Sequence, residues 1–230
     1  MTSTLLSISS FDRADTQVFD QPFSFMVAHG VLPADRRAEL SRDFPDYREA
    51  GFFPYDEHDC GPAIRELVTR LTDADTARAI GRRLHIDDLD AYPTLVTLCR
   101  SLNRRHGTIH TDSKSKIATV LLYLNESWPD SSAGCLRFLR SVDDIDDLAT
   151  SEIKPLYGEF AAFRRAENSF HGHLPFEGER RVIQVAWLVD EEAKLRKTRR
   201  GRGSRLLKKL AGGLDRKFGS GRDRNASHRD

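Results

Sequence analysis

The triplet His110-Thr111-Asp112 offers two side chains that could bind one metal ion. In an extended segment, residues two positions apart point to the same face, so the imidazole and the carboxylate would emerge side by side. A His-x-Asp triplet is short, however, and a solvated strand end without any ligand role is the commoner explanation of one. The triplet predicts a metal site only if further ligands occur elsewhere in the chain.

Residues 168–189, NSFHGHLPFEGERRVIQVAWLV, supply a candidate third ligand in His171. A turn at 175–178 follows it, and then an apolar strand that opens with arginines. Two histidines and one carboxylate form the facial triad of non-haem Fe(II) oxygenases, which leaves three adjacent octahedral positions open. An arginine from the neighbouring strand could pair bidentately with a carboxylate of a co-substrate bound there. His110 and Asp112, together with a histidine of this downstream segment, therefore fit the donor set of an iron site.

The hydrophobic pattern indicates the elements that must position these residues. Near the N-terminus it predicts a strand within 23–32 and helices over 33–44, 63–71 and 74–84, the last capped by Asp73. From residue 94 the period changes to two, which is typical of strands. The expected fold is therefore mainly β, an antiparallel sandwich or barrel with helices packed against one sheet. The predicted strands are 94–99, 107–110, 117–124, 135–139, 158–163 and 182–189.

Over residues 95–189 the sequence resembles the catalytic domain of the Fe(II)/2-oxoglutarate dioxygenases of the prolyl 4-hydroxylase and hypoxia-type prolyl hydroxylase superfamily. The resemblance implies a double-stranded β-helix, or jelly roll, with the metal at its open mouth. It places the catalytic core at 94–190, with residues 1–93 as a strand and helix support region of the same domain. The matching elements, in order, are HTD at 110–112, TVLLYLNESW at 119–128, GCLRF at 134–138, GEFAAF at 158–163 and HGHLPFEGERRVIQVAW at 171–187.

The resemblance also assigns roles to single residues. It makes His110 and Asp112 the proximal iron ligands and His171 the distal one, because His171 lies four residues before the turn proline. His173, two residues further on, is then expected beside the metal site or on its substrate side. Tyr123 matches a tyrosine that hydrogen-bonds the distal carboxylate of 2-oxoglutarate.

The arginine that would anchor 2-oxoglutarate is either Arg180 or Arg181, which point to opposite faces of one strand. In the family, this arginine lies six residues before a tryptophan, which is the relation of Arg181 to Trp187. The face of Arg181 continues as an apolar set, whereas the face of Arg180 carries Gln184. We therefore expect Arg181 to face the interior and to hold the co-substrate.

The implied activity is hydroxylation of an unactivated C–H bond, with release of succinate and CO2. The cofactors would be Fe(II) and 2-oxoglutarate, with ascorbate as a candidate reductant. A prolyl or other peptidyl residue and a small metabolite all remain open as substrates, because residues 1–93 carry no recognisable motif.

The charge of the chain is unevenly distributed. Residues 191–230 hold fourteen Lys and Arg against five Asp and Glu, a net of +9, so the overall charge of +1 leaves −8 for residues 1–190. We expect a flexible basic tail from about residue 190, since four of its glycines weaken a helix. The alternative function is a jelly-roll binding module whose tail contacts anionic surfaces, either an anionic polymer or a membrane.

Composition sets the remaining limits. The chain has 230 residues, and 39% of them are hydrophobic, which is enough for a sizeable core and excludes global disorder. No apolar run approaches the length of a membrane span, and no signal peptide is recognisable, so a cytoplasmic location is expected. Three cysteines without a CxxC motif argue against a disulfide framework.

Overall fold

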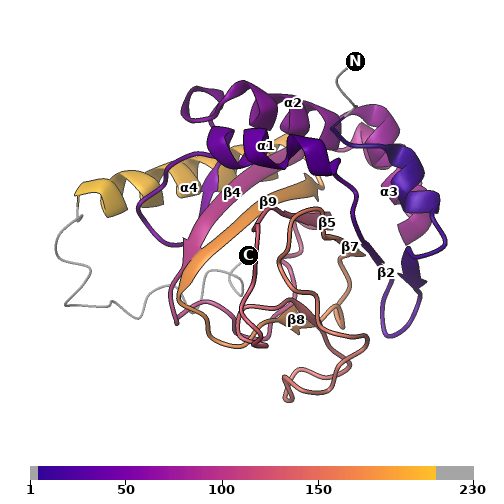
Figure 1. Ribbon diagram of the computed structural model, residues 1–230. Helices are drawn as coiled ribbons and strands as arrows, with labels where there is room; N and C mark the ends of the chain where they lie inside the picture. Colours follow the sequence, from indigo (N-terminus) through magenta and orange to yellow (C-terminus); the bar gives the residue numbers. More distant parts are fainter. Residues whose placement is uncertain (1–4, 211–230) are drawn as a thin grey trace.

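The computed structural model describes residues 5–210, with side chains described as far as residue 203 (Figure 1). The helices are α1 Arg37–Asp43, α2 Pro62–Leu71, α3 Ala74–Leu84 and α4 Glu191–Leu210, with short 3-10 helices η1 Ile8–Asp12, η2 Ala34–Arg36, η3 Glu57–Asp59 and η4 Leu89–Ala91. The strands are β1 Gln17–Phe19, β2 Phe25–Ala28, β3 Phe52–Pro54, β4 Thr94–Leu102, β5 Lys116–Tyr123, β6 Arg137–Phe138, β7 Phe160–Arg164, β8 His171–Gly172 and β9 Gly178–Leu188.

The strands form two antiparallel sheets. The large sheet has seven strands in the order β1-β2-β7-β5-β9-β4-β3, and the small one pairs β6 with β8. Helices α1, α2 and α3 cover one face of the large sheet, while β8 and the long loops lie on its other side (Figure 1). The fold is the predicted jelly roll with helices packed against one sheet.

Two apolar layers hold these parts together. One lies between the helices and the large sheet, and it includes Ile183, Val185 and Trp187 of β9. The other fills the interior of the jelly roll and includes Val182 of the same strand. Both faces of β9 are therefore buried, and this decides where the two arginines at its start can point.

The N-terminal region forms the elements that its pattern predicts. Helix α2 buries the apolar residues spaced along one face, and the Asp73 carboxylate accepts a hydrogen bond from the backbone N–H of Thr76, which caps α3. Strands β1 and β3, both from this region, form the two edges of the large sheet. Residues before 93 thus share one sheet with the strands that carry the site.

The prediction of a flexible tail from about residue 190 is wrong for its first part. Two residues connect β9 to helix α4, and Ala193 is buried against Ala186 and Leu188 of that strand. At Gly201 an added Cβ would lie 2.5 Å from Pro54, so this glycine permits the close approach of helix and strand. Residues 211–230 of the predicted tail lie outside the described part.

Two expectations from composition can also be compared with the structure. The three cysteines are buried and free, as expected in the absence of a disulfide framework. Within residues 5–210, no helix combines the length and the apolar character that crossing a membrane requires.

Candidate metal centre and co-substrate pocket

The structure pairs His110 with His171 through their backbones. The N–H of each donates to the carbonyl of the other, with both N···O distances 3.0 Å, and this isolated antiparallel bridge joins the two segments. The two imidazole rings lie 4.4 Å apart, centre to centre. Two histidines that are 61 positions apart in the sequence are therefore fixed beside each other.

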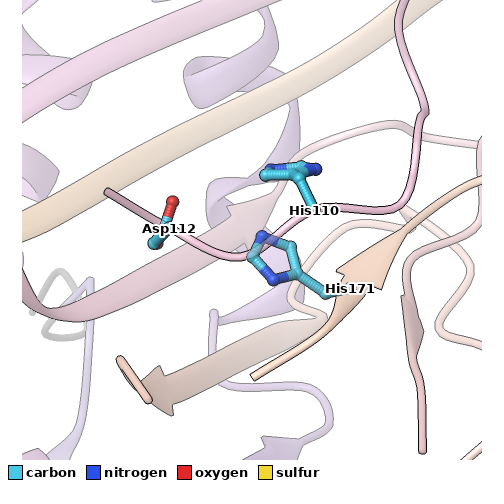
Figure 2. A group of neighbouring side chains, drawn as sticks. All are labelled: His110, Asp112 and His171. Carbon is cyan, nitrogen blue, oxygen red and sulfur yellow. The ribbon is translucent and has the colours of Figure 1, made fainter. Parts of the chain in front are cut away.

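Asp112 completes a cluster of three possible ligands. One ligand atom each from His110, Asp112 and His171 lies within 4.8 Å of the others (Figure 2). Asp112 and His171 are buried, and His110 is half-buried at the open side. The structure thus brings together the three residues that the sequence singled out. The predicted strand 107–110 is not formed: His110 makes an isolated bridge, and the triplet lies in the segment before β5.

Hydrogen bonds fix which nitrogen of each histidine is available. Nδ1 of His110 lies 2.9 Å from the carbonyl oxygen of Thr108, and Nδ1 of His171 lies 2.9 Å from that of Ser169. A carbonyl only accepts, so Nδ1 carries the proton and Nε2 keeps its lone pair. Burial lowers the pKa of His171 to about 3, so this imidazole is neutral at physiological pH. Nε2 is therefore the atom that each ring can offer to a metal ion.

Asp112 is held as an ionised carboxylate. Its Oδ1 accepts from Lys116 Nζ at 2.6 Å and its Oδ2 from Thr119 Oγ1 at 2.5 Å. Burial alone would raise the pKa of Asp112, but the charge of Lys116 and the two hydrogen bonds outweigh it and hold this pKa well below its usual range. Two imidazoles and one carboxylate are a donor set that suits Fe(II). Our sequence reasoning missed Lys116 and Thr119, although Thr119 shares a strand face with Tyr123.

Arg180, not Arg181, lies inside the jelly roll. Its side chain is 3% exposed, its Nε donates to the carbonyl of Gly134 at 2.8 Å, and its Nη2 donates to the Tyr123 hydroxyl at 3.1 Å. The guanidinium carbon is 5.0 Å from the centre of the Tyr123 ring. Tyr123 therefore occupies the interior position that was expected of it, but beside the other arginine.

Arg181 points to the helix side of the sheet, so the prediction that it faces the interior is wrong. Its Nη1 donates to Ser41 Oγ of α1 at 2.6 Å, and its guanidinium pairs with Glu179. The physical reason is the double burial of β9: the apolar set in phase with Arg181 packs under the helices and does not line the jelly roll. The face of β9 that carries Arg181 is apolar, as predicted, but it packs against the helices and not inside the jelly roll.

His173 stays outside the cluster of three. Its Nδ1 lies 2.8 Å from the Leu174 carbonyl oxygen, and its ring packs where a side chain at Gly107 would otherwise be. Gly107 has φ +106°, which favours glycine, and this lets the two segments approach. Burial lowers the pKa of His173 to about 4. The ring therefore packs as a neutral group behind the loop that leads to His110.

A comparison with protein families gives one match, and it covers this whole site. The model of the 2OG-Fe(II) oxygenase superfamily matches residues 83–189. Residues 83–189 form a 2OG-Fe(II) oxygenase domain. The match includes the three clustered residues as well as Tyr123 and Arg180. The protein is accordingly an Fe(II)/2-oxoglutarate-dependent dioxygenase, and its cofactors are Fe(II) and 2-oxoglutarate.

Solved structures show the same fold. A prolyl-4-hydroxylase from Pseudomonas putida aligns with a TM-score of 0.50 at 17% identity, over 79% of this chain and 96% of that one. A prolyl hydroxylase from Trichoplax adhaerens, in complex with a peptide fragment of the hypoxia inducible factor oxygen degradation domain, aligns with a TM-score of 0.49 at 15% identity, over 83% and 90%. A comparison with curated protein sequences gives no match. The alignment with the Pseudomonas putida structure thus shows that this chain shares the fold of that protein.

Proposed function

We propose that the dioxygenase hydroxylates an unactivated C–H bond of a peptidyl substrate and releases succinate and CO2. His110, Asp112 and His171 would hold Fe(II), and Arg180 with Tyr123 would hold the distal carboxylate of 2-oxoglutarate. The bound iron and co-substrate supply the oxidising chemistry, in which one oxygen atom of O2 enters the alcohol and the other enters succinate. The protein contributes orientation and the exclusion of water.

The observation that carries this proposal is the environment of Arg180. Its guanidinium is almost fully buried, yet among the described residues no carboxylate lies within ion-pairing distance of it. A buried charge is costly unless it is paired. The Gly134 carbonyl and the Tyr123 hydroxyl satisfy two of the five N–H donors and supply no negative charge. A planar fork in this setting suits a ligand carboxylate, which it can bind through two parallel hydrogen bonds.

Aromatic residues exclude water from the His171 side of the cluster, while its His110 side is open to solvent. The Phe163 ring lies 4.5 Å from the His171 ring, centre to centre, and Phe138 packs against Phe163. His110, by contrast, is half-buried and borders the solvent. A substrate would therefore approach on the His110 side, while Lys116 and Thr119 hold the carboxylate of Asp112 in position.

The fold supports a peptidyl prolyl side chain as the first substrate to test. The Pseudomonas putida structure with this fold is a prolyl-4-hydroxylase. A small metabolite is the second candidate, because the described residues of the N-terminal region contain no motif that names a substrate. The expected cytoplasmic location stays a prediction.

The test is to follow binding and turnover separately. Fe(II) and then 2-oxoglutarate are titrated under anaerobic conditions, and succinate release is measured in air against proline-containing peptides and free amino acids, with and without ascorbate. Asp112→Ala and His171→Ala should each abolish metal binding, whereas the matched control His173→Ala should retain it. Metal binding that survives in Asp112→Ala would contradict the ligand assignment. Succinate release coupled to amino acids but to no peptide would contradict the substrate class.

A further inference from the structure

A cavity lies away from the metal centre, between α4 and the loop that leads from Asp112 into β5. Its volume is about 220 Å³, and its lining residues are Ser115, Ala193, Arg196, Lys197 and Arg200. Arg196 and Arg200 are four positions apart, so they lie on one face of α4. The cavity belongs to the part of α4 that packs on the sheet through Ala193.

The charged residues that line this cavity are all positive. Arg196 forms an ion pair with Glu192 at 2.8 Å, with Arg196 Nη1 and Glu192 Oε1 in contact. No carboxylate within the described residues lies within ion-pairing distance of Arg200, which is exposed. With Lys197, the lining thus carries three cations, and two carboxylates adjoin it: Glu192 on Arg196 and Asp190 on the Ala193 N–H. A concave surface lined by charges of one sign concentrates counter-ions.

Neutral hydrogen-bonding groups complete the lining. The Ser115 side chain is 7% exposed, and its hydroxyl oxygen lies 3.0 Å from Ser113 Oγ. Ser113 Oγ in turn accepts from Lys197 Nζ at 2.8 Å. The Ser115 backbone carbonyl also accepts from the N–H of Val189 at 3.0 Å, which ties the loop to the end of β9. The hydroxyls and the ammonium are therefore held by the fold before any ligand arrives.

We propose that this cavity binds the phosphate group of a small ligand. Guanidinium forks bind phosphate through two parallel hydrogen bonds, and an ammonium and hydroxyls add further donors to its oxygens. A volume of about 220 Å³ lies below the roughly 300–1,000 Å³ of pockets for drug-sized molecules, so free phosphate or a small phosphate monoester fits best. The site shares no residue with the iron cluster, so the proposal stands independently of the proposed hydroxylation.

The test measures binding of inorganic phosphate and of phenyl phosphate to the full chain by calorimetry, at constant ionic strength set with chloride. Arg200→Ala removes a cation of the lining, and we expect it to weaken phosphate binding about tenfold or more. The matched control is Arg199→Ala, which removes the same charge from the adjacent exposed position outside the lining. The control should change the affinity less than about twofold, since consecutive residues of a helix point in different directions and Arg199 is not part of the lining.

A second variant protects the test against a folding defect. Arg196 is also exposed, so Arg196→Ala should weaken phosphate binding in the same way, and the midpoint of thermal unfolding is compared for all three variants. Tighter binding of phenyl phosphate than of inorganic phosphate would identify a monoester as the ligand, and the reverse would identify free phosphate. Equal losses in Arg199→Ala and Arg200→Ala, or saturable binding of heparin or anionic vesicles without any of phosphate, would overturn the proposal in favour of diffuse attraction to a polyanion.

Discussion

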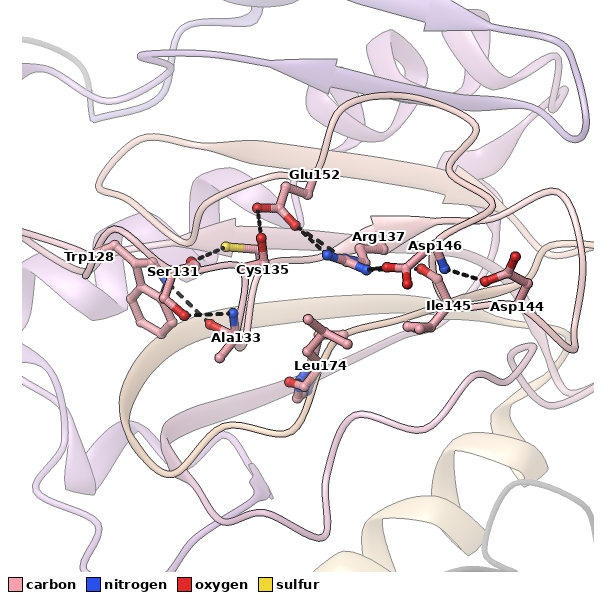
Figure 3. Close-up of polar contacts among 12 residues, drawn as sticks. Trp128, Ser131, Ala133, Cys135, Arg137, Asp144, Ile145, Asp146, Glu152 and Leu174 are labelled. Carbon is pink, nitrogen blue, oxygen red and sulfur yellow. Dashed lines mark hydrogen bonds and ion pairs between the residues drawn. The ribbon is translucent and has the colours of Figure 1, made fainter.

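Arg137 on β6 and Arg180 on β9 are both buried arginines of the jelly roll, with 5% and 3% of their surfaces exposed. Arg137 is surrounded by acceptors from its own chain: it pairs with Asp146 and donates to Glu152 from Nη2 at 2.9 Å and from Nε at 3.1 Å (Figure 3). Arg180 has a carbonyl and a phenol only. One guanidinium is neutralised by the fold, and the other is left for a ligand.

The contrast separates a structural role from a binding role for the same residue type. Glu152 also accepts from Ser132 Oγ at 2.7 Å, and the Asp146 N–H donates to Asp144 Oδ1. Arg137 therefore holds the connection between β6 and β7 at two points, Asp146 and Glu152 (Figure 3). Removing the Arg137 side chain should therefore lower the stability of the fold. Removing the Arg180 side chain should lower the affinity for 2-oxoglutarate.

The largest effect is expected from Arg180→Met, which should lower the affinity of the iron-loaded protein for 2-oxoglutarate. A bidentate pair in a water-poor pocket contributes about 2–5 kcal/mol, which corresponds to a loss of about thirty- to several-thousand-fold. The free energy of unfolding without ligand should be unchanged or higher, because an unpaired buried charge is removed. Calorimetric titration and urea denaturation measure the two quantities. Arg181→Met is the matched control, and a comparable loss there would reverse the assignment of the two arginines.

Arg137→Met should give the opposite pattern. We expect the free energy of unfolding to fall by about 1.5–3 kcal/mol, since charge-assisted hydrogen bonds to Glu152 are lost and Asp146 is largely exposed to solvent. The affinity for 2-oxoglutarate should stay within about twofold of the original. Urea denaturation measures the first and calorimetry the second. A strong loss of co-substrate affinity with intact stability would mean that the two arginines are not as distinct as their contacts indicate.

Tyr123→Phe tests the neutral partner of Arg180. The substitution keeps the ring under the guanidinium and removes the hydroxyl, so we expect the affinity for 2-oxoglutarate to fall about tenfold, as for one hydrogen bond to a charged group. The same calorimetric titration measures it. An unchanged affinity would show that the hydroxyl serves only to satisfy Arg180.

The smallest effect is expected from Glu152→Gln, which keeps the shape of the Arg137 contact and removes its charge. About 0.5–1.5 kcal/mol of unfolding free energy should be lost, because neutral hydrogen bonds replace charge-assisted ones. Urea denaturation at matched pH measures it. If the loss equalled that of Arg137→Met, the charge rather than the geometry would hold the loop.

The sequence could predict the parts of this protein that depend on local pattern. The period of two identified β4, β5, β7 and β9, the capping aspartate located α3, and the residue types of His110, Asp112 and His171 indicated the cluster. The phase of Arg180 and Arg181 could not be decided in this way. Val182 and Ile183 are both fully buried, in different layers, so the apolar pattern of β9 contains no signal that separates its two faces.

Helix α4 illustrates a second limit. Its composition is that of a solvated segment, and Ala193 and Gly201 are poor evidence for packing when read alone. Their role depends on Ala186, Leu188 and Pro54, which are brought near only by the folded sheet. In the same way, the contacts of Asp112 with Lys116 and Thr119 follow from a turn whose geometry the sequence does not specify. Tertiary proximity, not residue type, determines these features.

The bridge between His110 and His171 also bears on the order of events during folding. Closing a connection of 61 residues is slow compared with forming α2 or α3, because chain entropy must be lost before any non-local contact compensates for it. A nascent chain that ends before residue 171 lacks one ligand altogether. The capacity to bind iron therefore arises only when this pairing closes. Because an ion bound there stabilises the native state by mass action, metal affinity and resistance to unfolding are linked through one equilibrium.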